Sequence, residues 1–250
     1  MNVLILSIGG FIFLLAILVF IRVKSGNKID VKNSDIVLAL IPVVLWLFLT
    51  GKIQEFTFGD LRIVAAIKEA STSPVSAQVT ELPIETVSKE LKGGVGLIPR
   101  LIRNEIQALN FRLGYGGYYG PAIAEYLQVL TQYPYLKYVI IEDQQDRFFG
   151  MMDAQYLAEL FRDPDSHINT DDFARWLNTA DVEKIQSIPG FIPRELALQK
   201  MSDKKEALRM MNSHDLQILP VVDEQEKFVG IVNRSKLTAS MLIDIADKVQ

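Results

Sequence analysis

Cysteine is absent from the 250-residue chain, which excludes disulfides, thiolate metal sites and thiol nucleophiles. Only two histidines, His167 and His214, are present, and they leave little for a histidine-based metal centre or catalytic triad. Acidic residues (30) outnumber lysine and arginine (26), and the net charge of −4 argues against binding of a nucleic acid polymer. The sequence also lacks a phosphate loop. It therefore predicts a protein that is not an enzyme, with no metal site.

Apolar residues make up 49% of the chain, and the longest uncharged runs lie near its beginning. Residues 3–21 would form a helix about 28 Å long, close to the roughly 30 Å thickness of a bilayer's hydrocarbon core. The run at 36–50 is shorter and contains Pro42. It is a second spanning helix, or else a buried or re-entrant one. The sequence therefore predicts a membrane anchor in residues 1–53, with helices at about 3–21 and 36–50 and the lipid bilayer as a partner.

The connector between these two runs carries the charges that bear on orientation. It contains Arg22, Lys24, Lys28 and Lys32, and such basic segments favour the cytoplasmic side. If both runs span, the remainder of the chain lies outside. If only the first run spans, the same rule places the remainder in the cytoplasm.

Residues 54–117 are interpreted as a juxtamembrane strand and helix region with a linker. Hydrophobic periodicity predicts a short strand turning into a helix over 54–70, and further helices at 85–91 and 101–113. The glycine- and tyrosine-rich stretch 114–121 is typical of a hinge. Its tyrosines either stack on a base or pack against a neighbouring domain.

The second half of the chain contains an internal repeat with a constant offset in numbering. The matched pairs are Asp143 and Asp223, Gln145 and Gln225, Phe148 and Phe228, Gly150 and Gly230, and Leu157 and Leu237. Each copy has the pattern of a strand, a turn, a second strand and a helix, and each follows a predicted helix. The second of these helices begins at a capping box formed by Asp203 and Glu206. Two such units must pack together to cover their sheets.

These motifs carry a family resemblance. The second copy resembles a CBS domain in three segments: Glu206–Met211, Leu219–Asp223 and Phe228–Val232. The first copy resembles a diverged CBS domain, so the whole resembles a CBS pair, or Bateman module. The resemblance implies a first repeat at 118–165, a connector at 166–193 and a second repeat at 194–250. It further implies two clefts between the copies that bind an adenine nucleotide or S-adenosylmethionine and signal to an attached transporter, channel or enzyme.

The resemblance also assigns candidate binding residues. Ribose-binding CBS domains place Ser or Thr after a Gly-apolar-apolar run and Asp three residues later. This chain has Asn233 and Lys236 at those positions in the second copy, and Asp153 and Tyr156 in the first. Lys236 is suited to a phosphate, and Asp153 to a ribose hydroxyl. We therefore expect Asp153, Asn233 and Lys236 to line an adenylate cleft, or else a cleft that serves only packing or dimerisation.

The predicted fold class is α+β, with N-terminal transmembrane helices followed by a tandem CBS pair. The predicted function is a membrane-anchored regulatory or interaction module that senses an adenine nucleotide. The alternatives are a structural dimerisation scaffold and an accessory subunit of a membrane transport complex, both without ligand. The expected partners are a second copy, through the CBS pair, and a membrane protein. Because nucleotide sensing needs the cytoplasm, the resemblance predicts a membrane localisation with a cytoplasmic C-terminal domain.

Overall fold

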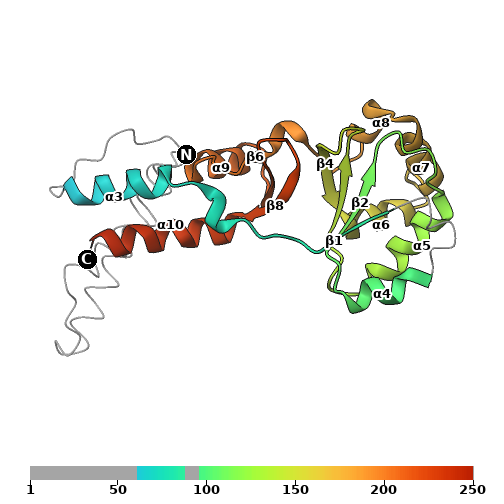
Figure 1. Cartoon of the computed structure of the whole chain (residues 1–250), viewed down its shortest axis with the longest axis horizontal. Coiled ribbons are helices and arrows are strands. Elements are labelled where there is room, and N and C mark those ends of the chain that lie inside the picture. The colour runs from blue at the N-terminus through green and yellow to red at the C-terminus, as the bar shows by residue number, and fades with distance from the viewer. Residues whose placement is uncertain (1–60, 88–95, 250) are drawn as a thin grey trace, which may run out of the picture. The chain divides into compact units, whose positions relative to one another are not determined.

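The computed structural model describes residues 61–87 and 96–249 (Figure 1). Residues 68–241 form one compact unit, which contains the first repeat and the part of the second repeat up to residue 241. The described residues 61–67 and 242–249 fall outside it. Helix α3 (Leu61–Thr72) opens the described chain, and the predicted helical end of segment 54–70 is thereby confirmed.

The predicted membrane anchor requires a correction. Across residues 61–87 and 96–249, no helix has both the length and the apolar character needed to cross a bilayer. The longest helix described there, α10 (Arg234–Val249), has 16 residues and carries several charges. It measures about 24 Å, less than the roughly 30 Å of a hydrocarbon core. This finding overturns the predicted fold class with transmembrane helices before the repeats. It also overturns the predicted membrane localisation with a cytoplasmic C-terminal domain. The two apolar runs, 3–21 and 36–50, lie outside the described residues.

Each repeat has a parallel strand pair, an antiparallel hairpin and a closing helix. The first repeat consists of β2 (Ala108–Arg112), α5 (Gly120–Leu130), β3 (Tyr138–Glu142), β4 (Phe148–Asp153) and α6 (Ala154–Arg162). The second consists of β6 (Leu198–Gln199), α9 (Lys204–Ser213), β7 (Ile218–Val222), β8 (Phe228–Asn233) and α10. In both, the first strand is parallel to the second, and the second is antiparallel to the third. The α+β character predicted for the repeats is confirmed.

The strand registers confirm the offset between the copies. In the first hairpin Ile141 pairs with Gly150, and in the second Val221 pairs with Gly230. Both hairpins shift register at the next residue. The same bulge in both copies sets the direction of the side chains that follow it.

The hairpin turns and the helix starts also follow the sequence. Asp143 Oδ1 accepts hydrogen bonds from the backbone N–H groups of Gln145 and Arg147, at 2.9 and 3.0 Å. Its equivalent Asp223 makes the same two bonds to the residues that match them, both at 2.9 Å. Helix α9 begins where the capping box predicts, because Asp203 Oδ1 accepts from the backbone N–H of Glu206 at 2.6 Å.

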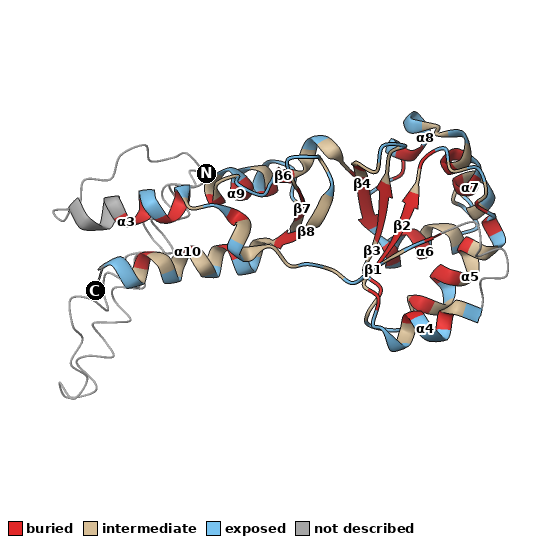
Figure 2. Ribbon diagram, in the orientation of Figure 1, coloured by how far each residue is buried: buried red, intermediate tan, exposed pale blue. Residues whose placement is uncertain are grey.

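The first repeat carries additional elements. Its sheet has the order β1-β2-β3-β4-β5, with β1 (Ile84–Thr86) at one edge and β5 (Ile192–Pro193) at the other. Helices α4 (Ile98–Arg103), α7 (Thr170–Thr179) and α8 (Val182–Gln186) pack into the hydrophobic core of the first repeat. Buried residues of α4, α5, α6, α7 and α8 form one hydrophobic cluster with the strands β2, β3 and β4. Figure 2 shows how the buried residues concentrate on these strands.

Two predicted helices are wrong in part. The stretch 101–113 was expected to be one helix, but α4 ends at Arg103 and β2 begins at Ala108. Residues 108–111 are all buried. A strand buried on both faces shows a continuous apolar run without alternation, which resembles the stripe of a short helix. In the predicted helix 85–91, Glu85 and Thr86 belong to strand β1.

The segment that precedes each repeat pairs with the other repeat. Strand β5, ahead of the second repeat, pairs with β4 of the first through Ile192 and Met151. Ahead of the first repeat, between 3₁₀ helix η1 (Val75–Gln78) and β1, Thr80 bridges to Ile231 of β8. The two exchanges are equivalent because Met151 and Ile231 are matched positions of the repeat, each directly after its glycine. Each repeat is therefore completed by a segment from the other side of the pair.

The two repeats also share apolar contacts. A hydrophobic cluster draws members from both: Ala108, Ile140, Phe148, Met151, Ile192, Val222 and Ile231. The equivalent residues Phe148 and Phe228 lie with ring centroids 5.6 Å apart. The backbone N–H of Phe148 donates to the carbonyl of Glu226 at 2.8 Å. The predicted internal pair is confirmed as two units that bury part of their apolar surface against each other.

Candidate functional site

At two equivalent places in the pair, the binding residues predicted from the sequence lie next to the segment that precedes the other repeat. We call the first the second-repeat junction, which contains Thr80, Gly230, Asn233 and Lys236. It lies where the segment before the first repeat meets β8 and the start of α10.

The other place is the first-repeat junction, which contains Gly150, Asp153, Tyr156 and Ile192. It lies where β5 meets β4 and the start of α6. Each residue of one junction has a structural equivalent in the other.

The second-repeat junction is polar. Two backbone hydrogen bonds, of 2.8 and 3.0 Å, join Thr80 to Ile231. The Lys236 ammonium donates to Thr80 Oγ1 at 3.4 Å. Asn233 Oδ1 accepts from the backbone N–H groups of Ser235 at 2.9 Å and Lys236 at 3.4 Å, at the beginning of α10. The junction thus places an exposed ammonium and a hydroxyl beside the first turn of a helix.

The first-repeat junction has different chemistry. Asp153 is the N-cap of α6, and its Oδ1 accepts from the backbone N–H of Tyr156 at 2.8 Å. The Tyr156 ring faces Gly190, where a Cβ would lie 3.5 Å from the ring. The Ile192 side chain is buried, with 8% of its surface exposed. An exposed carboxylate, an aromatic ring and a buried aliphatic chain therefore occupy the places of the amide, the ammonium and the hydroxyl.

The structure separates the predicted residues into two groups. It brings Asn233 and Lys236 together in one junction and places Asp153 in the other. Sequence reasoning missed Thr80, which lies 156 positions from Lys236 in the chain. No local motif marks it, and only the exchange of segments brings it to α10.

A glycine of each repeat lies where the segment that precedes the other repeat passes close to its strand. A Cβ on Gly230 would lie 2.5 Å from the carbonyl oxygen of Thr80, and Gly230 has φ of +154°. A Cβ on Gly150 would lie 2.1 Å from Cζ of Phe191. Both glycines in the repeat are therefore required where another segment crosses a strand.

An ionic network joins the two hairpin turns. Asp143 Oδ2 lies 2.8 Å from a guanidinium nitrogen of Arg147 and 2.8 Å from one of Arg194. Both arginines also lie 3.5 Å from a carboxylate oxygen of Glu226 in the second repeat. Burial alone would raise the pKa of Asp143. Hydrogen bonds from the backbone N–H of Arg147, the two arginine side chains and the backbone N–H of Gln145 outweigh it and hold that pKa at about 2.

The glycine- and tyrosine-rich stretch 114–121 is fixed to α7. Asn178 Oδ1 accepts from the backbone N–H groups of Gly117 and Tyr118, at 2.8 and 2.9 Å. The Tyr118 ring is buried, and its hydroxyl accepts from the backbone N–H of Arg112 at 2.7 Å. Burial raises the pKa of Tyr118 to about 12. Of the two interpretations of these tyrosines, packing against the neighbouring elements is therefore confirmed for Tyr118.

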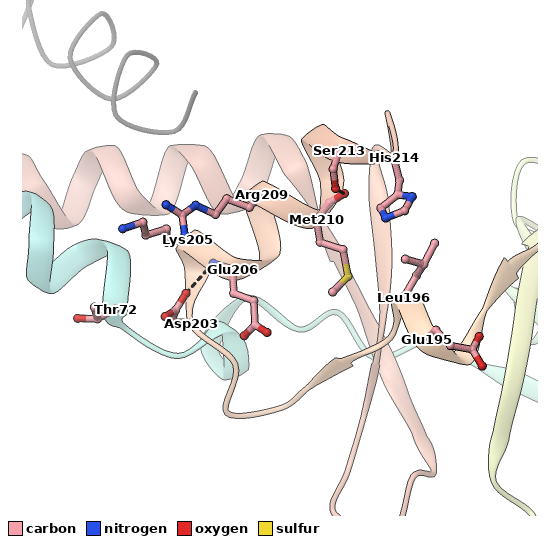
Figure 3. Close-up of a pocket in the computed structure, with 10 residues that line it drawn as sticks. All are labelled: Thr72, Glu195, Leu196, Asp203, Lys205, Glu206, Arg209, Met210, Ser213 and His214. Carbon is pink, nitrogen blue, oxygen red and sulfur yellow. Dashed lines mark hydrogen bonds between the residues drawn. The ribbon is translucent and has the colours of Figure 1, made fainter. Parts of the chain in front are cut away.

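A cavity of about 610 Å³ lies along α9 (Figure 3). It is lined by Thr72, Glu195, Leu196, Asp203, Lys205, Glu206, Arg209, Met210, Ser213 and His214. Its acidic and basic side chains are mixed, so its lining selects neither sign of ligand charge. The predicted binding residues do not line it. In the part of the chain that the structure describes, no group of three or more His, Asp or Glu side chains is placed to hold a metal ion.

Comparison with known proteins adds a family match. Residues 197–242 match the family model described as CBS domain. This range runs from just before β6 into α10 and includes Asn233 and Lys236. No curated protein matches the chain.

Solved structures show similarity over a larger part of the chain. One is the CBS domain of a bacterial CNNM/CorC family Mg²⁺ transporter in complex with ATP, with 15% identity and a TM-score of 0.41, covering 72% of this chain and 94% of that one. Another is the cytosolic domain of the Mg²⁺ channel MgtE in complex with ATP, with 20% identity, a TM-score of 0.34, and 53% and 44% covered. A third is a CBS domain pair/ACT domain protein from Thermotoga maritima, with 17% identity, a TM-score of 0.35, and 68% and 97% covered.

Proposed function

We propose that this chain is a regulatory module that binds an adenine nucleotide at the second-repeat junction. The CBS-domain match covers the β8 and α10 side of this junction. The resemblance to a CBS pair implies ligands of this class between the copies. The observation that carries the proposal is the Lys236 ammonium, 3.4 Å from the Thr80 hydroxyl at the start of α10.

The chemistry of this junction suits phosphate more than ribose. An ammonium offers three donors, a hydroxyl adds one, and the first turn of a helix adds a favourable dipole for an anion. The position that holds a ribose-binding carboxylate in related domains is Lys236, which cannot accept a hydrogen bond. The phosphate groups therefore supply most of the affinity. ATP, ADP and AMP bind more tightly than adenosine or S-adenosylmethionine.

A second function is favoured by one specific observation. A side-chain oxygen of Asp153 already accepts a backbone hydrogen bond at the start of α6, and one of Asn233 does the same at α10. If that is their whole role, the pair is a dimerisation scaffold without ligand. In that case the exposed Lys236 serves solubility.

Titration calorimetry on the full chain separates these functions. Each of ATP, ADP, AMP, adenosine and S-adenosylmethionine is titrated with and without Mg²⁺. In parallel, melting is followed with each ligand in excess, since a ligand at 100 times its dissociation constant adds about 2.7 kcal/mol. We expect binding of the phosphorylated ligands and at least about tenfold weaker binding by Lys236→Gln, a loss of about 1.4 kcal/mol.

Lys200→Gln is the matched control, because Lys200 is an exposed lysine in the turn after β6. It leaves binding unchanged. Wild-type protein that neither binds any of the five ligands nor melts at a higher temperature with them would refute nucleotide binding and favour the scaffold.

A further inference from the structure

The two junctions can be compared residue by residue because the exchange of segments is equivalent. Met151 pairs with Ile192, and Ile231 bridges to Thr80, so Thr80 and Ile192 occupy the same place. The offset of the repeat then equates Lys236 with Tyr156. It likewise equates Asn233 with Asp153.

Charge distinguishes the two sets. The second-repeat junction offers an ammonium, a hydroxyl and a neutral carboxamide. The first-repeat junction offers a phenol ring at Tyr156, a buried isoleucine side chain at Ile192 and an exposed carboxylate at Asp153. A carboxylate has only acceptors and repels a phosphate. The first set therefore disfavours the ligand that the second set attracts.

An aromatic side chain packs on Gly150 at the first-repeat junction, while Tyr156 stays 42% exposed. The Phe191 ring lies over Gly150, close enough that a Cβ there would meet its Cζ at 2.1 Å. The same ring packs on Phe149, with centroids 5.6 Å apart. The adjoining Gly190 faces the Tyr156 ring. At the other junction, the groups nearest to Gly230 are the Thr80 backbone and the Val79 side chain, neither of which is a ring.

Ion pairs also fasten the segment that forms the first-repeat junction. Arg194 follows β5 directly, and its Nε donates to the carbonyl of Phe148 at 2.5 Å. Its Nη2 donates to Asp143 at 2.8 Å. By the equivalence of Ile192 and Thr80, the matching position in the other segment is Leu82. The segment at the first-repeat junction is thus tied to its hairpin by contacts that a leucine cannot make.

We infer that the pair is functionally asymmetric: the second-repeat junction binds one phosphate-bearing ligand per chain, and the first-repeat junction binds none because its side chains lack the phosphate-binding groups. This inference rests on the proposed function and adds the stoichiometry and the residues that set it. Lys236 and Thr80 make one junction competent, and Asp153 with Tyr156 make the other incompetent.

Calorimetric stoichiometry with ATP tests the asymmetry in the full chain. The wild type binds one ATP per chain. Lys236→Tyr, which gives the second junction the aromatic residue of the first, lowers the affinity at least tenfold. The triple variant Asp153→Asn/Tyr156→Lys/Ile192→Thr, which gives the first junction the residues of the second, binds two ATP per chain. Asp153→Asn alone keeps one site, and melting curves verify that each variant is folded.

The outcomes distinguish this inference from the proposed function. Two ATP per wild-type chain would overturn the asymmetry and leave nucleotide binding standing. One ATP per chain with unchanged affinity in Lys236→Tyr would overturn the assignment of the site to this junction. A folded triple variant that still binds one ATP would overturn the role given to the side chains of the first-repeat junction. Wild-type protein that binds no ATP would refute both proposals.

Discussion

The ring of Phe148 lies 5.6 Å from the ring of Phe228, its own equivalent in the second copy of the repeat. Each ring follows a hairpin turn, and the two turns meet there. The backbone reinforces the contact, because the N–H of Phe148 donates to the Glu226 carbonyl. Contact between equivalent residues is the pattern expected when two similar units face each other across a local twofold axis.

Removing these rings tests how strongly the repeats depend on each other. Phe148 is fully buried, so Phe148→Ala lowers the free energy of unfolding by about 3–5 kcal/mol. A double-mutant cycle with Phe228→Ala gives a coupling energy of about 0.5–1.5 kcal/mol. Urea unfolding measures both. Tyr133→Ala, at an exposed position, is the control and changes stability by less than about 0.5 kcal/mol. Additive effects of the two phenylalanine variants would contradict direct contact.

The ionic network around Asp143 makes stability depend on acid pH. The pKa of Asp143 falls from its ordinary value of 3.8 to about 2 in the folded state. The unfolded state therefore binds the proton first as the pH falls, and the stabilisation is present above about pH 4 and lost towards pH 2. We expect the stability difference between wild type and Asp143→Asn to be largest above pH 4 and to shrink below it. Urea unfolding at a series of pH values measures this difference, and one that stays constant from pH 5 to pH 2 would contradict the network.

Tyr118 gives the corresponding test at alkaline pH. Burial raises the pKa of Tyr118 from 10.0 to about 12, so the unfolded state loses the proton first. The stability that Tyr118 contributes is complete below about pH 10 and is lost as the pH rises towards 12.

Tyr118→Phe removes this alkaline dependence. At neutral pH it costs about 1–3 kcal/mol, because the Arg112 backbone N–H loses the hydroxyl that accepts its hydrogen bond. Urea unfolding of both proteins at neutral and alkaline pH checks the two effects. Tyr119→Phe, at an exposed neighbouring position, is the control for loss of a tyrosine hydroxyl. Equal stability of wild type and Tyr118→Phe at neutral pH would contradict the buried hydrogen bond.

The equivalent glycines Gly150 and Gly230 differ in the atoms that a Cβ at each position would contact. A Cβ on Gly230 meets the Thr80 carbonyl, which backbone hydrogen bonds hold in place. A Cβ on Gly150 meets the tip of the Phe191 ring, and a side chain moves aside by a change of χ1 more easily than a backbone shifts. Overpacking costs about 1–3 kcal/mol. We expect Gly230→Ala near the upper end and Gly150→Ala near the lower end, as measured by urea unfolding. The reverse order would show that the Phe191 ring is the more rigid neighbour.

Local chemistry explains why much of the repeat could be predicted. The Asp143 and Asp223 turns are stabilised by side-chain to backbone bonds within four residues, and Asp203 caps α9 within three. Such interactions depend on neighbours in the chain, so their residues leave a signal in the sequence. The constant offset between the copies is visible because many such signals recur together.

Local sequence signals do not predict the structure of a segment that is buried by elements distant in the chain. Residues 108–111 have the apolar content of a short amphipathic helix, and they became a strand because β1 and β3 pair with both edges of β2. The apolar runs at 3–21 and 36–50 led to a membrane prediction that the helices of the described chain do not bear out. Hydropathy indicates that a segment is buried, but it does not indicate which surface buries it.

The sequence by itself determined the two copies, their hairpins, their helix caps and the unusual residues Asp153, Asn233 and Lys236, because each depends on spacing along the chain. Only the tertiary structure decided which residues those three meet. It joined Thr80 to Lys236 and Ile192 to β4, because one segment bridges to β8 and the other adds an edge strand to the first sheet. Pairing between segments so far apart costs chain entropy that only the assembled sheets repay, and short-range patterns therefore carry no trace of it.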